Sequence, residues 1–290
     1  MTEELVIRFP QSILLNGPQP EDYPFTHHFF RREYLKDKEG FTELFAHIRQ
    51  EVKAFHAHNS VAGFCYQQPH GYAGDYEMIE RLYTRYVSED STVARWDRFA
   101  QAQPAAKAVR NRKTYFMNLL ESRPYTSVLN LASGPCRDLK EYFDQYTDAD
   151  VQVDCVELDK NAIAYAQNLL GANGRVRFFN QNVLRLQTEA RYDLVWSAGL
   201  FDYFTDAIFV RVLSRMLKNL NPGGELVIGN FSDTNPNRAF MEVAMNWHLH
   251  HRSEKKLTEL ALAAGATHHH IRVQQEAEGV NLFLHIRDKG

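Results

Sequence analysis

The sequence predicts an α/β fold in which a mostly parallel sheet carries helices on both faces. From Tyr125 onward, short apolar runs alternate with segments whose apolar residues recur every three or four positions. Strands and helices that alternate at this spacing form parallel sheets. Before that point the helical spacing dominates, and the last two apolar runs flank Glu278-Gly279, which predicts an antiparallel hairpin. We therefore expect a mainly helical part at 1–112 and an α/β part at 113–290.

The N-terminal part begins with two segments predicted to be extended, LVIRF and SILLN, which proline and glycine residues interrupt. Helical spacing follows in FTELFAHIRQEVKAFHAH and in YEMIERLYTRYV. Between these two segments, VAGFCYQQPHGYAGD is rich in glycine and aromatic residues and is predicted to be a loop. Long loops are uncommon in compact domains unless they have a function, so this segment is a candidate lid over a ligand.

The α/β part contains seven predicted strands. In chain order they are TSVLNLA, VQVDCVEL, VRFFNQNV, YDLVWSAG, ELVIGNF, IRVQQ and VNLFLHIR. The predicted helices between them are DLKEYFDQY, NAIAYAQNLLGANG, FVRVLSRMLKNLNPGG and KKLTELALAAGA, three of which run into glycine or proline stops.

Composition narrows the class of protein. The 33 Lys and Arg residues against 36 Asp and Glu residues leave a formal charge of −3, whereas binding to a phosphate backbone needs a broad basic face. Three cysteines cannot build a disulfide framework, which indicates a reducing compartment. The N-terminus lacks the pattern of a signal peptide, and no apolar run approaches the length of a membrane span. We expect a cytoplasmic protein that binds neither nucleic acid nor membrane.

Small and polar residues follow the first predicted strand. Asn130 ends that strand, and Ala132, Ser133 and Gly134 form a tight turn before the next helix. Small residues in such a turn let backbone N–H groups approach a ligand closely. The turn alone is a weak signal, because many strand-to-helix connections look alike.

Polar side chains also stand at the ends of the next three strands. Glu157 lies 157 − 134 = 23 residues after Gly134, where a carboxylate can accept hydrogen bonds from both ribose hydroxyls. Asn182 follows the third strand, where an amide can read an adenine edge, and Ser197 ends the fourth. In open α/β sheets ligands bind beyond these strand ends. The combination predicts a nucleoside-containing ligand.

Sequence motifs indicate which nucleoside-containing ligand the protein binds. Neither G-x-G-x-x-G nor G-x-x-x-x-G-K-[ST] occurs, which disfavours dinucleotides and ATP. VLNLASGPC instead resembles the first motif of class I S-adenosylmethionine (SAM) methyltransferases, usually close to VLDLGCGPG, from which it departs at Asn130, Ala132, Ser133 and Cys136. NPGGELVIGNF is similar to the turn before that family's fifth strand. The resemblance implies a Rossmann-like, seven-stranded sheet with an antiparallel C-terminal hairpin, and SAM as the cofactor.

The resemblance also implies a set of cofactor-binding residues. In it Glu157 matches the ribose-binding acid and Asn182 matches the residue that reads adenine. The full implied set is Asn130, Ala132, Ser133, Gly134, Glu157, Leu158, Asn182, Val183, Ser197 and, for the cofactor carboxylate, Arg112.

Further segments resemble one bacterial SAM methyltransferase subfamily that includes enzymes making 3-hydroxypalmitate methyl ester. These segments are PHGYAGDYEM, AVRNRK, AGLFDYF and NPNRAFMEVAMNWHLHHRSE. This resemblance implies methyl transfer to a small-molecule acceptor, with a carboxylate as one acceptor class, beneath an N-terminal lid.

Four residues are candidates to orient the acceptor. Tyr72 and Asp75 lie in the glycine-rich N-terminal segment, and Asp202 and Tyr203 follow the fourth strand. Asp75 equally fits the N-cap of the helix that follows it, and Tyr203 equally fits simple packing at the sheet edge. Arg112 is also typical of a surface or ion-pair residue.

Thirteen histidines raise the question of a metal. His248, His250 and His251, placed on a predicted helix, lack the i, i+4 spacing that chelates best, and no carboxylate cluster joins them. We expect no metal site. A homodimer is compatible with the sequence.

Two alternatives to methyl transfer stay open. SAM can also be attacked at the γ-carbon of its aminobutyrate group, which releases methylthioadenosine, either by an external nucleophile or by its own amine in a cyclisation to azetidine-2-carboxylate. A protein that binds SAM without turnover is the second alternative, and the reduced glycine content of the first motif supports it.

Overall fold

The computed structural model describes residues 9–289, which divide into two compact units. The first unit comprises the described residues up to Val109 together with Pro236–His248, and the second comprises Arg110–Asn235 and the residues from Leu249 on. Residues 236–248 therefore belong with the N-terminal helices, although in sequence order they interrupt the α/β part.

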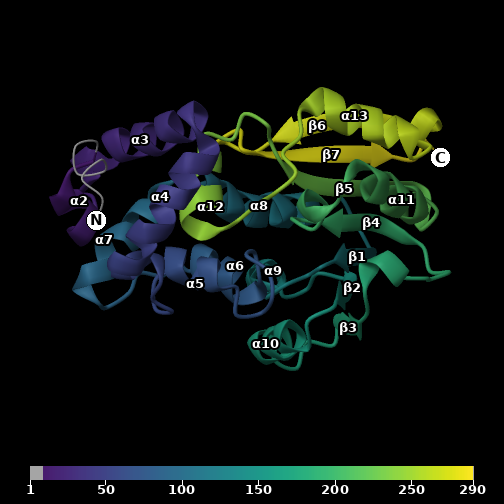
Figure 1. Cartoon of the computed structure of the whole chain (residues 1–290). Helices are drawn as coiled ribbons and strands as arrows, with labels where there is room; N and C mark the ends of the chain where they lie inside the picture. Colours follow the sequence, from purple (N-terminus) through teal and green to yellow (C-terminus); the bar gives the residue numbers. More distant parts are fainter. Residues whose placement is uncertain (1–8, 290) are drawn as a thin grey trace. The chain divides into compact units, whose positions relative to one another are not determined.

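The first unit is made of helices (Figure 1), and aromatic side chains pack between them. Its elements are α2 (Gln11–Asn16), η1 (Pro20–Asp22), α3 (Tyr23–Lys36), α4 (Lys38–Glu51), η2 (Lys53–Phe55), α5 (Val61–Gln67), α6 (Tyr76–Tyr83), α7 (Ser91–Ala102), the start of α8 (Pro104–Glu121) and α12 (Arg238–Met245). The ring of Phe240 lies 5.1 Å from Phe30 of α3 and 5.3 Å from Phe99 of α7. These edge-to-face contacts hold α12 in the N-terminal core.

Two predictions about the N-terminal part are wrong. SILLN is helical within α2, and the first half of the predicted loop is helix α5. The Ser60 hydroxyl caps α5 by accepting from the Gly63 N–H at 2.9 Å, and Val61 through Cys65 are all buried. Burial and a cap therefore outweigh the loop-like composition. The predicted segment LVIRF lies, as far as Arg8, outside the described residues.

The second unit contains a seven-stranded sheet in the order β3-β2-β1-β4-β5-β7-β6 (Figure 1). The strands are β1 (Ser127–Leu131), β2 (Gln152–Glu157), β3 (Val176–Asn180), β4 (Tyr192–Ser197), β5 (Leu220–Phe231), β6 (His270–Gln275) and β7 (Asn281–Arg287). The first five pair in parallel, and β7 is antiparallel to both β5 and β6. The predicted Rossmann-like sheet with its closing hairpin is confirmed.

Helices cover both faces of this sheet. Apolar residues of α11 (Asp206–Leu217) and α13 (Glu254–Ala263) pack in one buried cluster with one face of the strands. Residues of α8, α9 (Arg137–Gln145) and α10 (Lys160–Leu170) pack in a second cluster with the other face. Burial on both faces explains why the central strands read as continuous apolar runs rather than alternating ones.

The strand order reverses at β1. The chain runs outward from β1 through β2 to β3, then returns to place β4 on the other side of β1. At such a switch point the loops after neighbouring strands diverge and leave a crevice beyond their carboxyl ends. The loops after β1, β2 and β4 therefore outline the expected ligand position.

Smaller differences from the sequence-based expectation concern turns. The Pro222-Gly223-Gly224 segment lies within β5, which begins at Leu220, rather than at the end of α11. His248 and His250 lie in irregular backbone after α12, not on a helix. Within residues 9–289, no helix is long and apolar enough to cross a membrane, and no three His, Cys, Asp or Glu side chains gather as metal ligands.

Candidate functional site

The loop after β1 has an unusual backbone. Ala132, Gly134 and Cys136 have φ values of +53°, +57° and +53°, a region that only glycine adopts without strain. The Ala132 N–H donates to the Val156 carbonyl at 2.8 Å, which continues the pairing of β1 with β2. A Cβ added at Gly134 would meet no atom of the described chain within 4 Å. The loop thus turns sharply while leaving open space over Gly134.

Glu157, at the end of β2, is bonded to this loop. One carboxylate oxygen accepts from the Leu158 and Asp159 N–H groups at 2.7 and 3.0 Å, and the other accepts from the Gly134 N–H at 3.0 Å. The residue is only 5% exposed. Three backbone donors therefore hold the carboxylate in one orientation at the switch point, where a ribose would need it.

Two buried polar groups at the end of β1 and in this loop lack partners. The Asn130 side-chain nitrogen and the Ser133 hydroxyl have no hydrogen bond within the described chain, although both residues are buried. A buried polar group without a partner costs about 1–3 kcal/mol. Such groups are rare in folded proteins and need an explanation. A polar ligand beyond β1 would satisfy both.

The other predicted cofactor residues stand at neighbouring strand ends. Asn182 caps η3 (Val183–Arg185) by accepting from the Leu184 N–H at 2.8 Å, so its amide nitrogen is the group that could read a base. Leu158 is 62% exposed, an apolar surface suited to one face of a base. The fully buried Ser197 hydroxyl donates to the Leu131 carbonyl at 3.2 Å, which gives it a structural role between β4 and β1.

Arg112, in the part of α8 that belongs to the second unit, is buried. A Cβ built on Gly199 would lie 2.6 Å from one terminal nitrogen of its guanidinium, so a side chain there would displace it. Burial raises the pKa values of two nearby carboxyls, Asp138 and Asp202, and the charge of Arg112 opposes that rise. Arg112 is therefore a positioned cation at the carboxyl-end side of the sheet, as a carboxylate ligand requires.

Asp202 lies in η4 (Phe201–Tyr203), and Tyr203 of the same turn is half-buried. The Asp202 carboxylate accepts from the Phe231 N–H at 2.6 Å and so joins this turn to the end of β5. Burial raises the pKa of Asp202 to about 6, against the opposing effect of Arg112 and Arg252. A carboxyl with this pKa titrates close to neutrality.

Asp138 is a residue that sequence reasoning missed. It lies in the first turn of α9, is buried, and has its pKa raised to about 6 by burial. The signal that could have found it is an acid two residues after the loop, at a helix N-terminus.

The substitution Asp202→Asn should stabilise the protein at neutral pH. Because the folded-state pKa of about 6 exceeds the ordinary value of 3.8, the folded state binds more protons, and the wild type loses stability as pH rises through this interval. Asparagine keeps an acceptor for the Phe231 N–H but carries no charge. The free energy of unfolding of the Asp202→Asn protein should exceed that of the wild type by up to about 3 kcal/mol at pH 8. At pH 5 the difference should be roughly half as large.

Urea denaturation at both pH values measures this difference. Asp193→Asn is a control variant for which we expect the opposite change in the free energy of unfolding. Although burial opposes it, hydrogen bonds from Asn221, Thr126 and Ser127 lower the pKa of Asp193 to about 2, so this variant should be destabilised. A pH-independent effect of Asp202→Asn would contradict the assignment.

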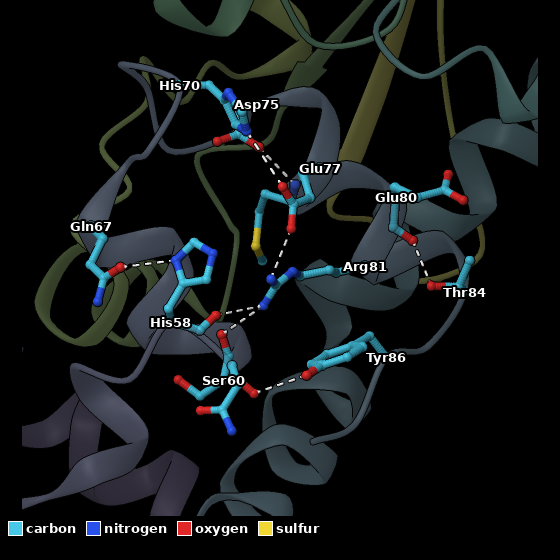
Figure 2. Close-up of polar contacts among 12 residues, drawn as sticks. His58, Ser60, Gln67, His70, Asp75, Glu77, Glu80, Arg81, Thr84 and Tyr86 are labelled. Carbon is cyan, nitrogen blue, oxygen red and sulfur yellow. Dashed lines mark hydrogen bonds and ion pairs between the residues drawn. The ribbon is translucent and has the colours of Figure 1, made fainter. Parts of the chain in front are cut away.

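The remaining two candidates, Tyr72 and Asp75, belong to the first unit. Asp75 is the N-cap of α6, and its carboxylate accepts from the Met78 N–H at 2.8 Å, which confirms the capping interpretation. Its second oxygen is buried without a partner in the described chain, and burial raises its pKa. Figure 2 shows His70 beside Asp75 at the start of α6. Tyr72 is half-buried.

An ion-pair network supports the start of α6 (Figure 2). Glu77 accepts from Arg81 at 2.9 Å and lies 3.4 Å from His70, and Arg81 also donates to the carbonyls of His58 and Ser60. These contacts tie α6 to the start of α5. The backbone on either side of Gly71 to Asp75 is thereby held.

Comparison with known protein families matches residues 128–224 to the model described as "Methyltransferase domain". This segment of the second unit is similar to a methyltransferase domain. The match begins in β1, ends in β5, and includes the loop after β1, Glu157, Asn182 and Ser197. Asn130 and Ser133, whose buried polar groups lack partners, fit a domain that holds a polar ligand there.

Solved structures of other proteins are similar to this chain. A possible exported protein from Bordetella parapertussis is 20% identical, with a TM-score of 0.63 over 74% of this chain and 80% of its own, and shows the shared fold. The 1,6-didemethyltoxoflavin-N1-methyltransferase from Burkholderia thailandensis, with bound S-adenosylhomocysteine, is 24% identical over 62% of this chain and 77% of its own, with a TM-score of 0.47. No curated protein matches the chain.

Proposed function

We propose that this methyltransferase transfers the methyl group of SAM to a small-molecule acceptor. The observation that carries the proposal is the Glu157 carboxylate, held by the Gly134 N–H inside the segment that matches a methyltransferase domain. The formal charge of −3 fits a small acceptor better than a nucleic acid.

In this proposal the ends of β1, β2 and β3, together with Arg112 of α8, hold the cofactor. Glu157 accepts from the ribose hydroxyls, the Asn182 amide and Leu158 contact adenine, and Asn130 with Ser133 bond the methionine part. Arg112, which Gly199 leaves room for, binds the cofactor carboxylate. Each of these residues belongs to the second unit.

The chemistry is a direct displacement. The acceptor attacks the methyl carbon in line with the breaking carbon–sulfur bond, and the sulfonium becomes the neutral thioether of S-adenosylhomocysteine. Such a reaction needs close, aligned reactants in a site without water, and it needs no covalent enzyme intermediate.

A carboxylate is the acceptor class we favour. An amine or hydroxyl acceptor must lose a proton to a base, whereas a carboxylate is ionised already. Both candidate bases, Asp75 and Asp202, use one oxygen to hold a backbone N–H group. We propose that the hydroxyl groups of Tyr72 and Tyr203 orient the acceptor by donating to its carboxylate. Asp75 and Asp202, whose pKa values are raised by burial, can donate to it in their protonated forms.

We also propose that residues 71–75 act as a lid when SAM is bound, because lids exclude water and position acceptors. Gly71 is exposed and has a φ of +93°, a conformation that favours glycine, at the start of this segment. Hydrogen exchange of its amides should slow when S-adenosylhomocysteine is added. The amides of α7 in the same unit are the internal reference. Equal exchange of 71–75 with and without ligand would remove the lid from the proposal.

The product formed from SAM tests the function itself. Purified protein given SAM alone should leave it intact, and addition of a mixture of small carboxylic acids should release S-adenosylhomocysteine in proportion to methyl ester. Mass spectrometry separates that product from methylthioadenosine. Methylthioadenosine formed from SAM alone would overturn the proposal in favour of attack on the γ-carbon. If the protein binds SAM but turns over no acceptor class, the alternative of a non-catalytic SAM-binding protein would replace the proposal.

A further inference from the structure

Two of the three cysteines lie in contact where the loop after β1 packs against β2. The Cys136 sulfur is 3.9 Å from the Cys155 sulfur, and both residues are at most 1% exposed. Cys136 is the last residue of the loop after β1, and Cys155 lies in β2, two residues before Glu157. Cys65 lies in the other unit.

We propose that Cys136 and Cys155 are a redox modification site, at which a peroxide converts the thiol pair to a disulfide. One thiol attacks the peroxide, forming a sulfenic acid with the release of water. The second thiol then displaces hydroxide from that sulfur, which leaves as water after protonation. Both thiols are oxidised by one electron each, and one hydrogen peroxide is reduced to two waters.

The distance between Cys136 and Cys155 is short enough for these two residues to form a disulfide. A disulfide bond is about 2.05 Å long, so the sulfur atoms must approach by roughly 1.9 Å from their present separation. The Cys136 sulfur also contacts the Ser133 carbonyl at 3.7 Å. Closing the bond therefore draws the end of the loop toward β2.

Disulfide formation would move the loop after β1, which contacts SAM in the proposed function. The Gly134 N–H, two residues before Cys136, donates to Glu157, two residues after Cys155. Cys136 already has a φ of +53°, which a non-glycine residue adopts only under strain. A disulfide that pulls on this residue changes the positions of Ser133 and Gly134. We expect SAM affinity to fall at least tenfold.

Burial of the Cys136 thiol determines the rate at which peroxide oxidises it. Contact with the Cys155 thiol and burial raise the pKa of Cys136, so little thiolate is present in the closed loop. Oxidation thus requires the loop to open, and bound SAM, which holds the loop, should slow it. At equilibrium, SAM should disfavour the disulfide by the same factor by which the disulfide weakens SAM binding.

The modification is tested by mass spectrometry. The reduced protein is treated with hydrogen peroxide, its free thiols are alkylated under denaturing conditions, and it is digested with trypsin. Arg137 and Lys140 separate the two cysteines, so a disulfide joins two peptides. We expect this linked pair, reversed by dithiothreitol, while Cys65 is still alkylated. Absence of the linked pair, under conditions that oxidise free glutathione, would overturn the proposal.

The effect on the cofactor is a separate measurement, which rests on the proposed function. Calorimetry should show at least tenfold weaker SAM binding after peroxide and recovery after dithiothreitol. Cys136→Gly, which suits a positive φ, and Cys155→Ala should each bind SAM equally before and after peroxide. A linked pair with unchanged affinity would overturn the regulatory part. If reduced wild type does not bind SAM, the proposed function fails, while the mass-spectrometric result still decides the modification.

Discussion

The substitution Glu157→Ala should weaken SAM binding by about five-fold to more than a hundred-fold. This range assumes that two ribose hydroxyls lose a buried acceptor, at a cost of about 1–3 kcal/mol. The variant also frees the N–H groups of Gly134, Leu158 and Asp159, which the carboxylate now holds. Cofactor contact and loop geometry are therefore lost together. Isothermal titration calorimetry with SAM measures the change.

Two further variants separate these contributions. Glu157→Gln keeps the shape but only one acceptor oxygen, so its amide nitrogen must replace an oxygen that accepts from a backbone N–H. This variant should lose less stability and less SAM affinity than Glu157→Ala. Glu189→Ala removes an exposed glutamate from the same unit and should leave binding unchanged. A folded Glu157→Ala protein with wild-type affinity would show that the ribose lies elsewhere.

The substitution Arg252→Ala should destabilise the second unit by about 3–5 kcal/mol, because it leaves several buried oxygen acceptors without a donor, at about 1–3 kcal/mol each. The buried guanidinium donates to the carbonyls of Phe201 and Phe204 at 3.1 and 2.5 Å, to the Asn230 side chain at 2.8 Å, and to Asp206 at 3.0 Å. It therefore joins the turn that carries Asp202 to the end of β5. Thermal and urea denaturation measure the loss.

The control for Arg252→Ala is Lys255→Ala. The Lys255 side chain is 88% exposed, and its ion pair with Glu259 spans 4.0 Å, so its removal should change stability by less than about 0.5 kcal/mol. Arg252→Lys keeps the charge but has too few donors for all these acceptors, and should fall between the two. A folded Arg252→Ala protein with wild-type stability would contradict this role.

The amino-acid pattern is sufficient to predict the sheet and to place the candidate site residues at the ends of its strands. The central strands contain short apolar runs between turn residues, and such runs are local features that do not depend on distant contacts. Parallel strands place their carboxyl ends at one edge, so Asn130, Glu157, Asn182 and Ser197 can be grouped from their positions in the chain. The cap of α6 by Asp75 is local in the same way.

Packing between residues far apart in the chain accounts for what the pattern does not predict. Helix α5 forms because its apolar residues are buried, whereas its composition indicates a loop. α12 joins the N-terminal core through Phe240, and the raised pKa of Asp138 arises from burial. The contact of Cys136 with Cys155 joins positions 19 residues apart. Burial and charge at a site are sums over neighbours from many elements, and no local pattern in the chain encodes them.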